Sequence, residues 1–166
     1  MDRHDNAEDL VSIDHLVREI IDRHRVAWLK NEIRFESDLA KINVKANPKL
    51  IQEAVEALIS HANEKLVRGC ELSFTLIDDL HQWELEVADN VGEFPKSQVE
   101  WDAVFSVPME KSETLTTALP FPNSPYLNKA YEAALLHGGQ LQTWDCPQGG
   151  RAYVLVIPKL IHRSAA

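Results

Sequence analysis

The sequence predicts an α/β fold, a two-layer α/β sandwich in which two or three helices cover one face of a mixed, mostly antiparallel sheet. The helical segments repeat apolar residues with a period of 3.6, so each one can bury a face. The extended segments alternate apolar and polar residues, which indicates strands with one buried face, and several of them occur as hairpin pairs. The chain has 166 residues, of which 45% are hydrophobic, enough for one domain with a core.

The longest amphipathic segment runs from Asn47 to Leu66. Asn47 is a suitable N-cap, and Pro48 suits the first helical position. The apolar stripe of this helix is formed by Leu50, Ile51, Ala54, Val55, Leu58, Ile59, Ala62 and Leu66. Polar residues occupy the opposite face, and His61 lies at its border, so we expect the stripe to pack on the sheet.

Two further helices and six strands complete the predicted fold. A first helix is expected over residues 10–28, and a last one over residues 126–136, where Gly138 and Gly139 end it. The predicted strands are residues 32–36, 41–45, 71–76, 83–87, 140–144 and 152–157. Residues 90–123 contain several prolines and are predicted to form a long irregular loop, a kind of segment that often has a function.

Composition limits the classes of function. We expect a single domain over residues 10–160, with a flexible N-terminus at residues 1–9 and a tail at residues 161–166. The formal net charge of −9 argues against binding to nucleic acid. The chain has neither a transmembrane run nor a signal peptide, so a cytoplasmic protein is expected. Its two cysteines are too few for a disulfide framework or a zinc site.

Four short segments lie within or next to the predicted elements. They read Ala57-Leu58-Ile59-Ser60-His61-Ala62, then Asp89-Asn90-Val91-Gly92-Glu93, and finally Ser124-Pro125-Tyr126-Leu127, followed after a helix by His137-Gly138-Gly139. Their order and spacing resemble the ATP-binding domain of sensor histidine kinases, a member of the superfamily of gyrase and the heat-shock chaperones. The resemblance covers roughly residues 13–159 and implies the same two-layer fold.

The resemblance also implies a nucleotide site. In the kinases the first segment reads N-L-L-x-N-A and holds the magnesium-phosphate end of ATP, and His61 stands where its second asparagine binds magnesium. The second segment reads D-x-G-x-G, and Asp89 occupies the position that reads the adenine amino group. By family position, the residues that would bind nucleotide are therefore Asp89, His61, Asn90 and Gly92, and the cofactor would be ATP with magnesium. From the residues alone, Asp89 could equally cap a turn, and His61 could be a packed or solvated side chain.

Several residues depart from the kinase pattern. Ala57 replaces an asparagine, or the glutamate base of the hydrolysing relatives, and alanine can neither accept a proton nor order a water. Magnesium prefers oxygen ligands, for which an imidazole is a poor substitute. Pro125 and Tyr126 replace the glycine segment that presents backbone N–H groups to phosphates, and proline has no N–H. We therefore predict no catalytic residues, no resident cofactor and no ATPase or kinase activity of this chain alone.

These observations predict a degenerate histidine-kinase-type ATPase domain that serves as a regulatory or docking module in two-component or phosphorelay signalling. Its expected partners are a response regulator or a histidine kinase-type signalling protein. One alternative is a functional ATP-binding domain with a divergent pocket, which would phosphorylate a histidine in trans. A second alternative is an anti-sigma-like partner-binding protein. His4, His15 and His24 are predicted to be solvated, because no helical hairpin of the phospho-acceptor type surrounds them.

Overall fold

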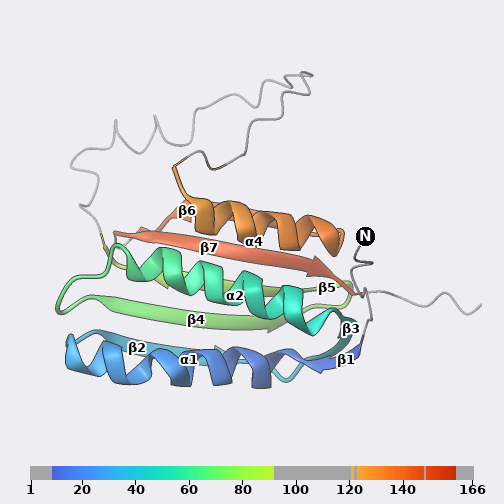
Figure 1. The fold of residues 1–166 in the computed structure, drawn as a ribbon, viewed down its shortest axis with the longest axis horizontal. Helices are drawn as coiled ribbons and strands as arrows, with labels where there is room; N and C mark the ends of the chain where they lie inside the picture. The colour runs from blue at the N-terminus through green and yellow to red at the C-terminus, as the bar shows by residue number, and fades with distance from the viewer. Residues whose placement is uncertain (1–8, 92–120, 122, 148, 160–166) are drawn as a thin grey trace, which may run out of the picture.

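The computed structural model describes residues 9–91, 121, 123–147 and 149–159, and Figure 1 shows their arrangement. Nearly all of the predicted N-terminal segment, the C-terminal tail and most of the predicted loop at residues 90–123 lie outside these residues, and so does Gly92. Within the described part of the chain, no helix combines the length and the apolar character needed to cross a membrane.

The main sheet has five strands in the order β2-β4-β5-β7-β6. Their bounds are Arg34–Leu39 for β2, Glu71–Asp78 for β4, Gln82–Asp89 for β5, Gln140–Asp145 for β6 and Arg151–Pro158 for β7. Only β2 and β4 pair in parallel, and the other neighbours are antiparallel, so the sheet is mixed and mostly antiparallel as predicted. A separate two-stranded sheet pairs β1 (Asp9–Ser12) with β3 (Asn43–Ala46).

Three helices lie side by side across one face of the main sheet (Figure 1). They are α1 (Ile13–Lys30), α2 (Pro48–Asn63) and α4 (Pro125–Leu136). The central helix, α2, buries the predicted stripe against alternate residues of β5, so Leu58, Trp83 and Leu85 are almost completely buried. The two-layer sandwich is therefore confirmed, with its core between the helices and the sheet.

Local chemistry fixes where two of the helices begin. The side chain of Asn47 accepts hydrogen bonds from the N–H groups of Lys49 and Leu50, as predicted for an N-cap before Pro48. The hydroxyl of Ser124 accepts a hydrogen bond from the N–H of Leu127 and caps α4 in the same way. The start of α4 and the opposite end of α2 line the same cavity, described below.

Three sequence predictions need correction. Residues 9–12 form β1, and the first helix runs from Ile13 to Lys30, not over residues 10–28. Leu10 lies three residues before Ile13, in phase with the helical stripe, but its backbone pairs with β3. The predicted strand at residues 32–36 becomes β2 and the one at residues 41–45 becomes β3; these two belong to different sheets. The helix predicted to reach Leu66 ends at Asn63, where Glu64 is the C-cap.

Candidate functional site

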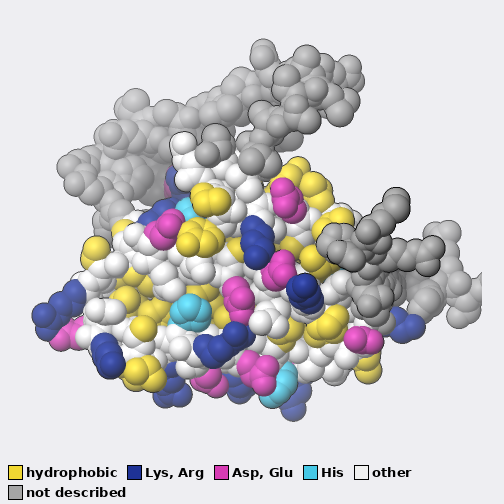
Figure 2. All heavy atoms as spheres, viewed as in Figure 1, with side chains coloured by type: hydrophobic (Ala, Val, Ile, Leu, Met, Phe, Trp, Pro, Cys, Tyr) yellow, Lys and Arg dark blue, Asp and Glu magenta, His cyan; other side chains and the backbone are white. Residues whose placement is uncertain are grey.

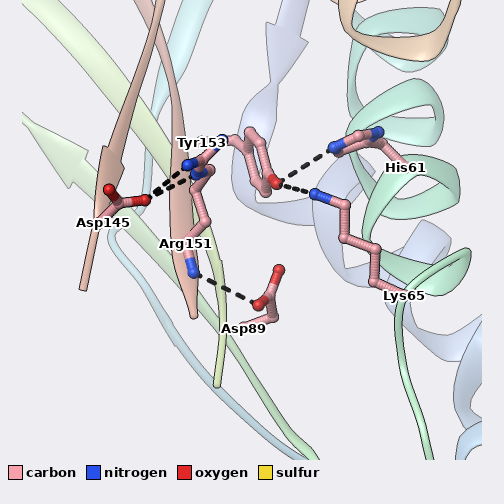
Figure 3. Close-up of polar contacts among 6 residues, drawn as sticks. All are labelled: His61, Lys65, Asp89, Asp145, Arg151 and Tyr153. Carbon is pink, nitrogen blue, oxygen red and sulfur yellow. Dashed lines mark hydrogen bonds and ion pairs between the residues drawn. The ribbon is translucent and has the colours of Figure 1, made fainter. Parts of the chain in front are cut away.

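His61 lies in the last turn of α2 and faces Tyr153 of β7 (Figure 3). It is only 6% exposed, so it is buried and does not lie at the solvent border predicted from the helical pattern. Its Nε2 atom is 3.1 Å from the hydroxyl of Tyr153, and the two rings meet edge to face with their centroids 4.8 Å apart. The hydroxyl of Tyr153 also accepts a hydrogen bond of 2.6 Å from the ammonium group of Lys65.

The second ring nitrogen of His61 contacts another element. Nδ1 is 2.9 Å from Oγ of Ser124, the same hydroxyl that caps α4. His61 therefore links α2 to β7 through Tyr153 and to α4 through Ser124. Both of its nitrogens are used inside the protein.

The charge state of His61 follows from its surroundings. Burial, and then the positive charges of Lys65 and Arg151, lower its pKa to about 4. The ring is neutral at neutral pH, so one nitrogen donates a hydrogen bond and the other accepts one. Hydroxyl groups can take either role, so Tyr153 and Ser124 satisfy the ring in both tautomers.

Asp89 ends β5 and is 5% exposed. Its Oδ1 atom accepts hydrogen bonds from the N–H groups of Val91, at 3.0 Å, and Arg151, at 3.4 Å. Its Oδ2 atom is buried and has no hydrogen-bond partner among the described residues. Burial raises the pKa of the carboxyl, and these hydrogen bonds and the nearby cations offset that rise only in part. Oδ2 could therefore accept a hydrogen bond from a ligand.

Asn90, the third predicted site residue, has a structural role at the end of β5. Its amide oxygen accepts a hydrogen bond of 2.7 Å from the N–H of Glu71, and its own N–H donates to the carbonyl of Glu71. Asn90 thus fixes the start of β4 against the end of β5. Its predicted contact with a nucleotide stays a prediction, as does that of Gly92.

Two cavities divide the predicted site residues between them. One has a volume of about 340 Å³, and its described lining residues are His61, Lys65, Phe121, Asn123, Ser124, Leu127, Thr143, Arg151 and Tyr153. Asp89 and Asn90 line a different cavity of about 360 Å³ at the end of the sheet, together with Arg34, Glu71 and Cys146. The structure therefore brings His61 together with Ser124, Lys65 and Tyr153, and places Asp89 and Asn90 elsewhere. No group of three or more His, Cys, Asp or Glu side chains in the described part of the chain is arranged to hold a metal ion.

Sequence reasoning did not find Tyr153, Lys65 or Arg151. One usable signal was present, because Tyr153 stands in a run of apolar strand residues, and a buried tyrosine hydroxyl needs a hydrogen-bond partner. A second was the spacing of Lys65, four residues after His61, which brings two side chains together near a helix end.

No protein-family model and no curated protein matches the sequence. Among solved structures, the catalytic domain of histidine kinase ThkA, in a nucleotide-free form, is similar over 92% of this chain and 97% of its own, with a TM-score of 0.67 and 18% identity. The mycobacterial sensor histidine kinase MprB gives a TM-score of 0.66 at 20% identity, over 92% of this chain and 97% of its own. The ATP-binding domain of PrrB from Mycobacterium tuberculosis gives a TM-score of 0.63 at 19% identity, over 93% of this chain and 99% of its own. The fold of this chain is thus that of the catalytic ATP-binding domains of sensor histidine kinases, as the resemblance implied.

Proposed function

We propose that this chain is a degenerate histidine-kinase-type ATPase domain that serves as a regulatory or docking module in two-component or phosphorelay signalling. The observation that carries the proposal is the state of His61, whose two ring nitrogens are bonded to Ser124 and Tyr153. In the family that the sequence resembles, this helical position binds magnesium. Here it is occupied by a neutral, buried side chain that closes a polar network.

Magnesium would be held poorly at this position. It favours six oxygen ligands in an octahedron and dehydrates reluctantly. For His61 to coordinate any metal, one nitrogen would have to give up its hydroxyl partner, so the buried hydrogen bond with Ser124 or Tyr153 would be lost. The residues present therefore do not fit a magnesium-ATP complex at this end of the site.

The start of α4 supports the same conclusion. Helix N-termini bind phosphate through N–H groups that have no partner in the helix. In α4, Pro125 has no N–H, and the N–H of Leu127 donates to the hydroxyl of Ser124. The N–H of Asn128 donates to the carbonyl of Ser124. Of the backbone donors in this first turn, one is therefore missing and two are used within the helix.

The proposed partners are a response regulator or a histidine kinase-type protein. The shared fold supports this choice, because a domain that keeps the fold without the magnesium-phosphate chemistry can still present its surface to the same signalling proteins. We propose that residues 10–160 act as one such module.

Calorimetric titration with ATP and magnesium tests the proposal. We expect no saturable heat at ATP concentrations in the millimolar range, and the same result for Asp89→Asn. In a second titration, purified response regulators and histidine kinases from the same genome are added one at a time, and at least one should bind saturably with or without ATP. Saturable ATP binding that is lost in Asp89→Asn, without any protein partner, would overturn the proposal.

A working ATP-binding domain that phosphorylates a histidine in trans is the second candidate, and one observation favours it. The unpartnered Oδ2 of Asp89 could accept a hydrogen bond from the amino group of adenine. Asp89, Asn90, Gly92 and His61 would then contact ATP. If only the base is recognised, adenosine should bind as tightly as ATP, whereas a functional kinase pocket should bind magnesium-ATP much more tightly than adenosine.

A further inference from the structure

The main sheet has a second face, which points away from the helices. Figure 1 shows α1, α2 and α4 together on one side of the sheet, so no described helix covers the other side, here called the outward face. Residues paired across strands point to the same face. One outward row consists of Glu36, Ser73, Ala88, Ala152 and Trp144, and the next of Asp38, Thr75, Glu86, Val154 and Gln142. The alternate residues of the strands, such as Phe74, Leu85 and Tyr153, belong to the core.

The outward face carries unpaired negative charge. Glu36 and Asp38 lie on β2, and Glu84 and Glu86 lie on β5, with β4 between the two pairs. None of these four carboxylates forms an ion pair with a described residue. Arg34, the one basic residue among the outward residues of the five strands, is already paired with Glu71.

The spacing of a sheet lets these charges act together. Residues i and i+2 of a strand are about 7 Å apart, and β2 and β5 are separated by two strand spacings, about 10 Å. These separations are close to the Debye length of about 8 Å at physiological salt, so the potentials of the carboxylates add in part. The outward face therefore attracts cations.

The helical face is different. Figure 2 shows that acidic and basic side chains alternate there, and Arg23 with Glu56 and Lys129 with Glu53 form ion pairs on it. An antiparallel sheet commonly turns one face to water. What distinguishes this sheet is that the charges on its outward face have one sign and no counter-charge among the described residues.

Shape and aromatic character add to the charge. Trp144, on the edge strand β6, is 45% exposed and has no ring contact with a described residue. Between Trp144 and Glu36 the row contains only small side chains, those of Ser73, Ala88 and Ala152. A hollow of about 290 Å³ lies over β2 and β4, lined by Glu36, Asp38, Ser73 and Thr75 together with Ser37 and Phe74. An exposed tryptophan face attracts guanidinium groups, and tryptophan is enriched among the residues that dominate protein interfaces.

We propose that the outward face of the sheet is the docking surface of this module, and that its occupant is an arginine-rich segment of a partner protein. The inference deepens the proposed function and rests on it, since it names the surface and the partner chemistry of the docking module. Guanidinium groups would lie against the carboxylates of β2 and β5 and on the ring of Trp144. A second copy of this chain fits less well, because it would bring further unpaired carboxylates to the interface.

This surface is separate from the residues at the family's nucleotide position. His61 and Ser124 lie on the helical side of the sheet, where they contact each other and Tyr153. Docking on the outward face therefore requires no nucleotide and no change in the network around His61.

The test titrates the full chain, labelled with nitrogen-15, with a hexa-arginine peptide at about 0.15 M ionic strength. We expect saturable shifts of the backbone amides of β2, β4 and β5 and of the indole N–H of Trp144, whereas the amides of α1 and α2 stay unshifted. Glu36→Gln and Glu86→Gln should each weaken binding about threefold, and together about tenfold, because single exposed ion pairs contribute little. Trp144→Ala should weaken it about threefold.

Glu132→Gln is the matched control, because it removes the same charge from an exposed position of α4 on the other side of the sheet. It should leave the affinity for the peptide unchanged, and thermal melting shows that each variant is folded. The proposal is overturned if the shifts do not saturate, if they spread equally over the helices, or if Glu132→Gln weakens binding as much as Glu36→Gln. Ultracentrifugation without peptide tests the other occupant, and a dimer that Trp144→Ala dissociates would also overturn the proposal.

A last titration separates this inference from the proposed function. The response regulator or kinase that binds in calorimetry is added to the double variant with Glu36→Gln and Glu86→Gln. Binding as tight as to the unchanged chain would refute this inference alone and leave the docking function standing. Saturable ATP binding that is lost in Asp89→Asn, without any protein partner, would refute the proposed function and leave the peptide result to stand on its own.

Discussion

The backbone of Gly150 packs directly against the carbonyl of Asp89. A Cβ atom added to Gly150 would lie 1.9 Å from that oxygen and 2.6 Å from Cα of Asn90. Gly150 also has a φ of +82°, in the left-handed region that favours glycine. This close approach fixes the turn before β7 against the end of β5, and so positions both Asp89 and Arg151.

We predict that Gly150→Ala destabilises the protein by more than about 3 kcal/mol, because both the φ angle and the missing space oppose a side chain. Gly69→Ala is the matched control. Gly69 has a φ of +85° but nothing within 4 Å of a built Cβ, so only the backbone strain, about 1–2 kcal/mol, should appear. Urea denaturation measures the free energy of unfolding of both variants. Equal decreases would show that the close contact with Asp89 does not contribute to stability.

Tyr153→Phe should lower the free energy of unfolding by about 1–3 kcal/mol, because the buried Nε2 of His61 and the ammonium group of Lys65 both lose the phenol hydroxyl as a hydrogen-bond partner. Tyr131→Phe, in α4, removes the same hydroxyl from a tyrosine whose ring packs against Phe121. Denaturant unfolding should show a much smaller loss for this control. A loss in Tyr153→Phe no greater than that in Tyr131→Phe would mean that the network around His61 contributes little to stability.

Local patterns predicted most of the fold. The β4–β5 hairpin was predictable because its alternation is regular, and the β6–β7 hairpin because a glycine-containing turn joins two extended segments. Helix α2 was predictable because its N-cap and its apolar stripe agree. β1 was missed because Leu10 is in phase with the stripe of the following helix and a strand of four residues is too short to show its own alternation. The parallel pairing of β2 with β4 is non-local and depends on the packing of the whole sheet.

The site was less predictable than the fold. His61 was identified from its family position, but its partner Tyr153 lies 92 residues further along the chain. Their contact depends on the register of β7, which sets Tyr153 opposite Val87. No local pattern encodes that register. The separation of Asp89 and His61 into two cavities likewise follows from tertiary packing.

Asp89→Asn should stabilise the protein at neutral pH, because it removes the negative charge that burial disfavours and leaves one polar atom without a partner, as Oδ2 is now. The folded-state pKa of Asp89 is raised, so the native protein binds its proton more tightly than the unfolded chain does. The penalty of the charged carboxylate is therefore full above that pKa and disappears as the pH falls below the ordinary value of 3.8. Asp38→Asn, at an exposed position of β2, is the control and should change the free energy of unfolding little. If the stabilisation by Asp89→Asn stayed constant as the pH fell to 3.8, the charged carboxylate of Asp89 would not be its cause.

His61 should give the protein a pH dependence of the opposite sign. Its pKa is lowered from 6.5 to about 4, so between these values the unfolded chain binds more protons than the native protein. Stability is therefore complete above pH 6.5 and falls as the pH is lowered toward about 4, by at most about 3 kcal/mol. His61→Gln should lack this loss, which urea denaturation across the same range would measure. The comparison is cleanest in an Asp89→Asn background, where the opposing titration is absent. His15→Gln, at an exposed histidine beside Glu19, is the control and should keep the wild-type dependence of unfolding free energy on pH. If His61→Gln kept that same dependence, the buried ring of His61 would not be its source.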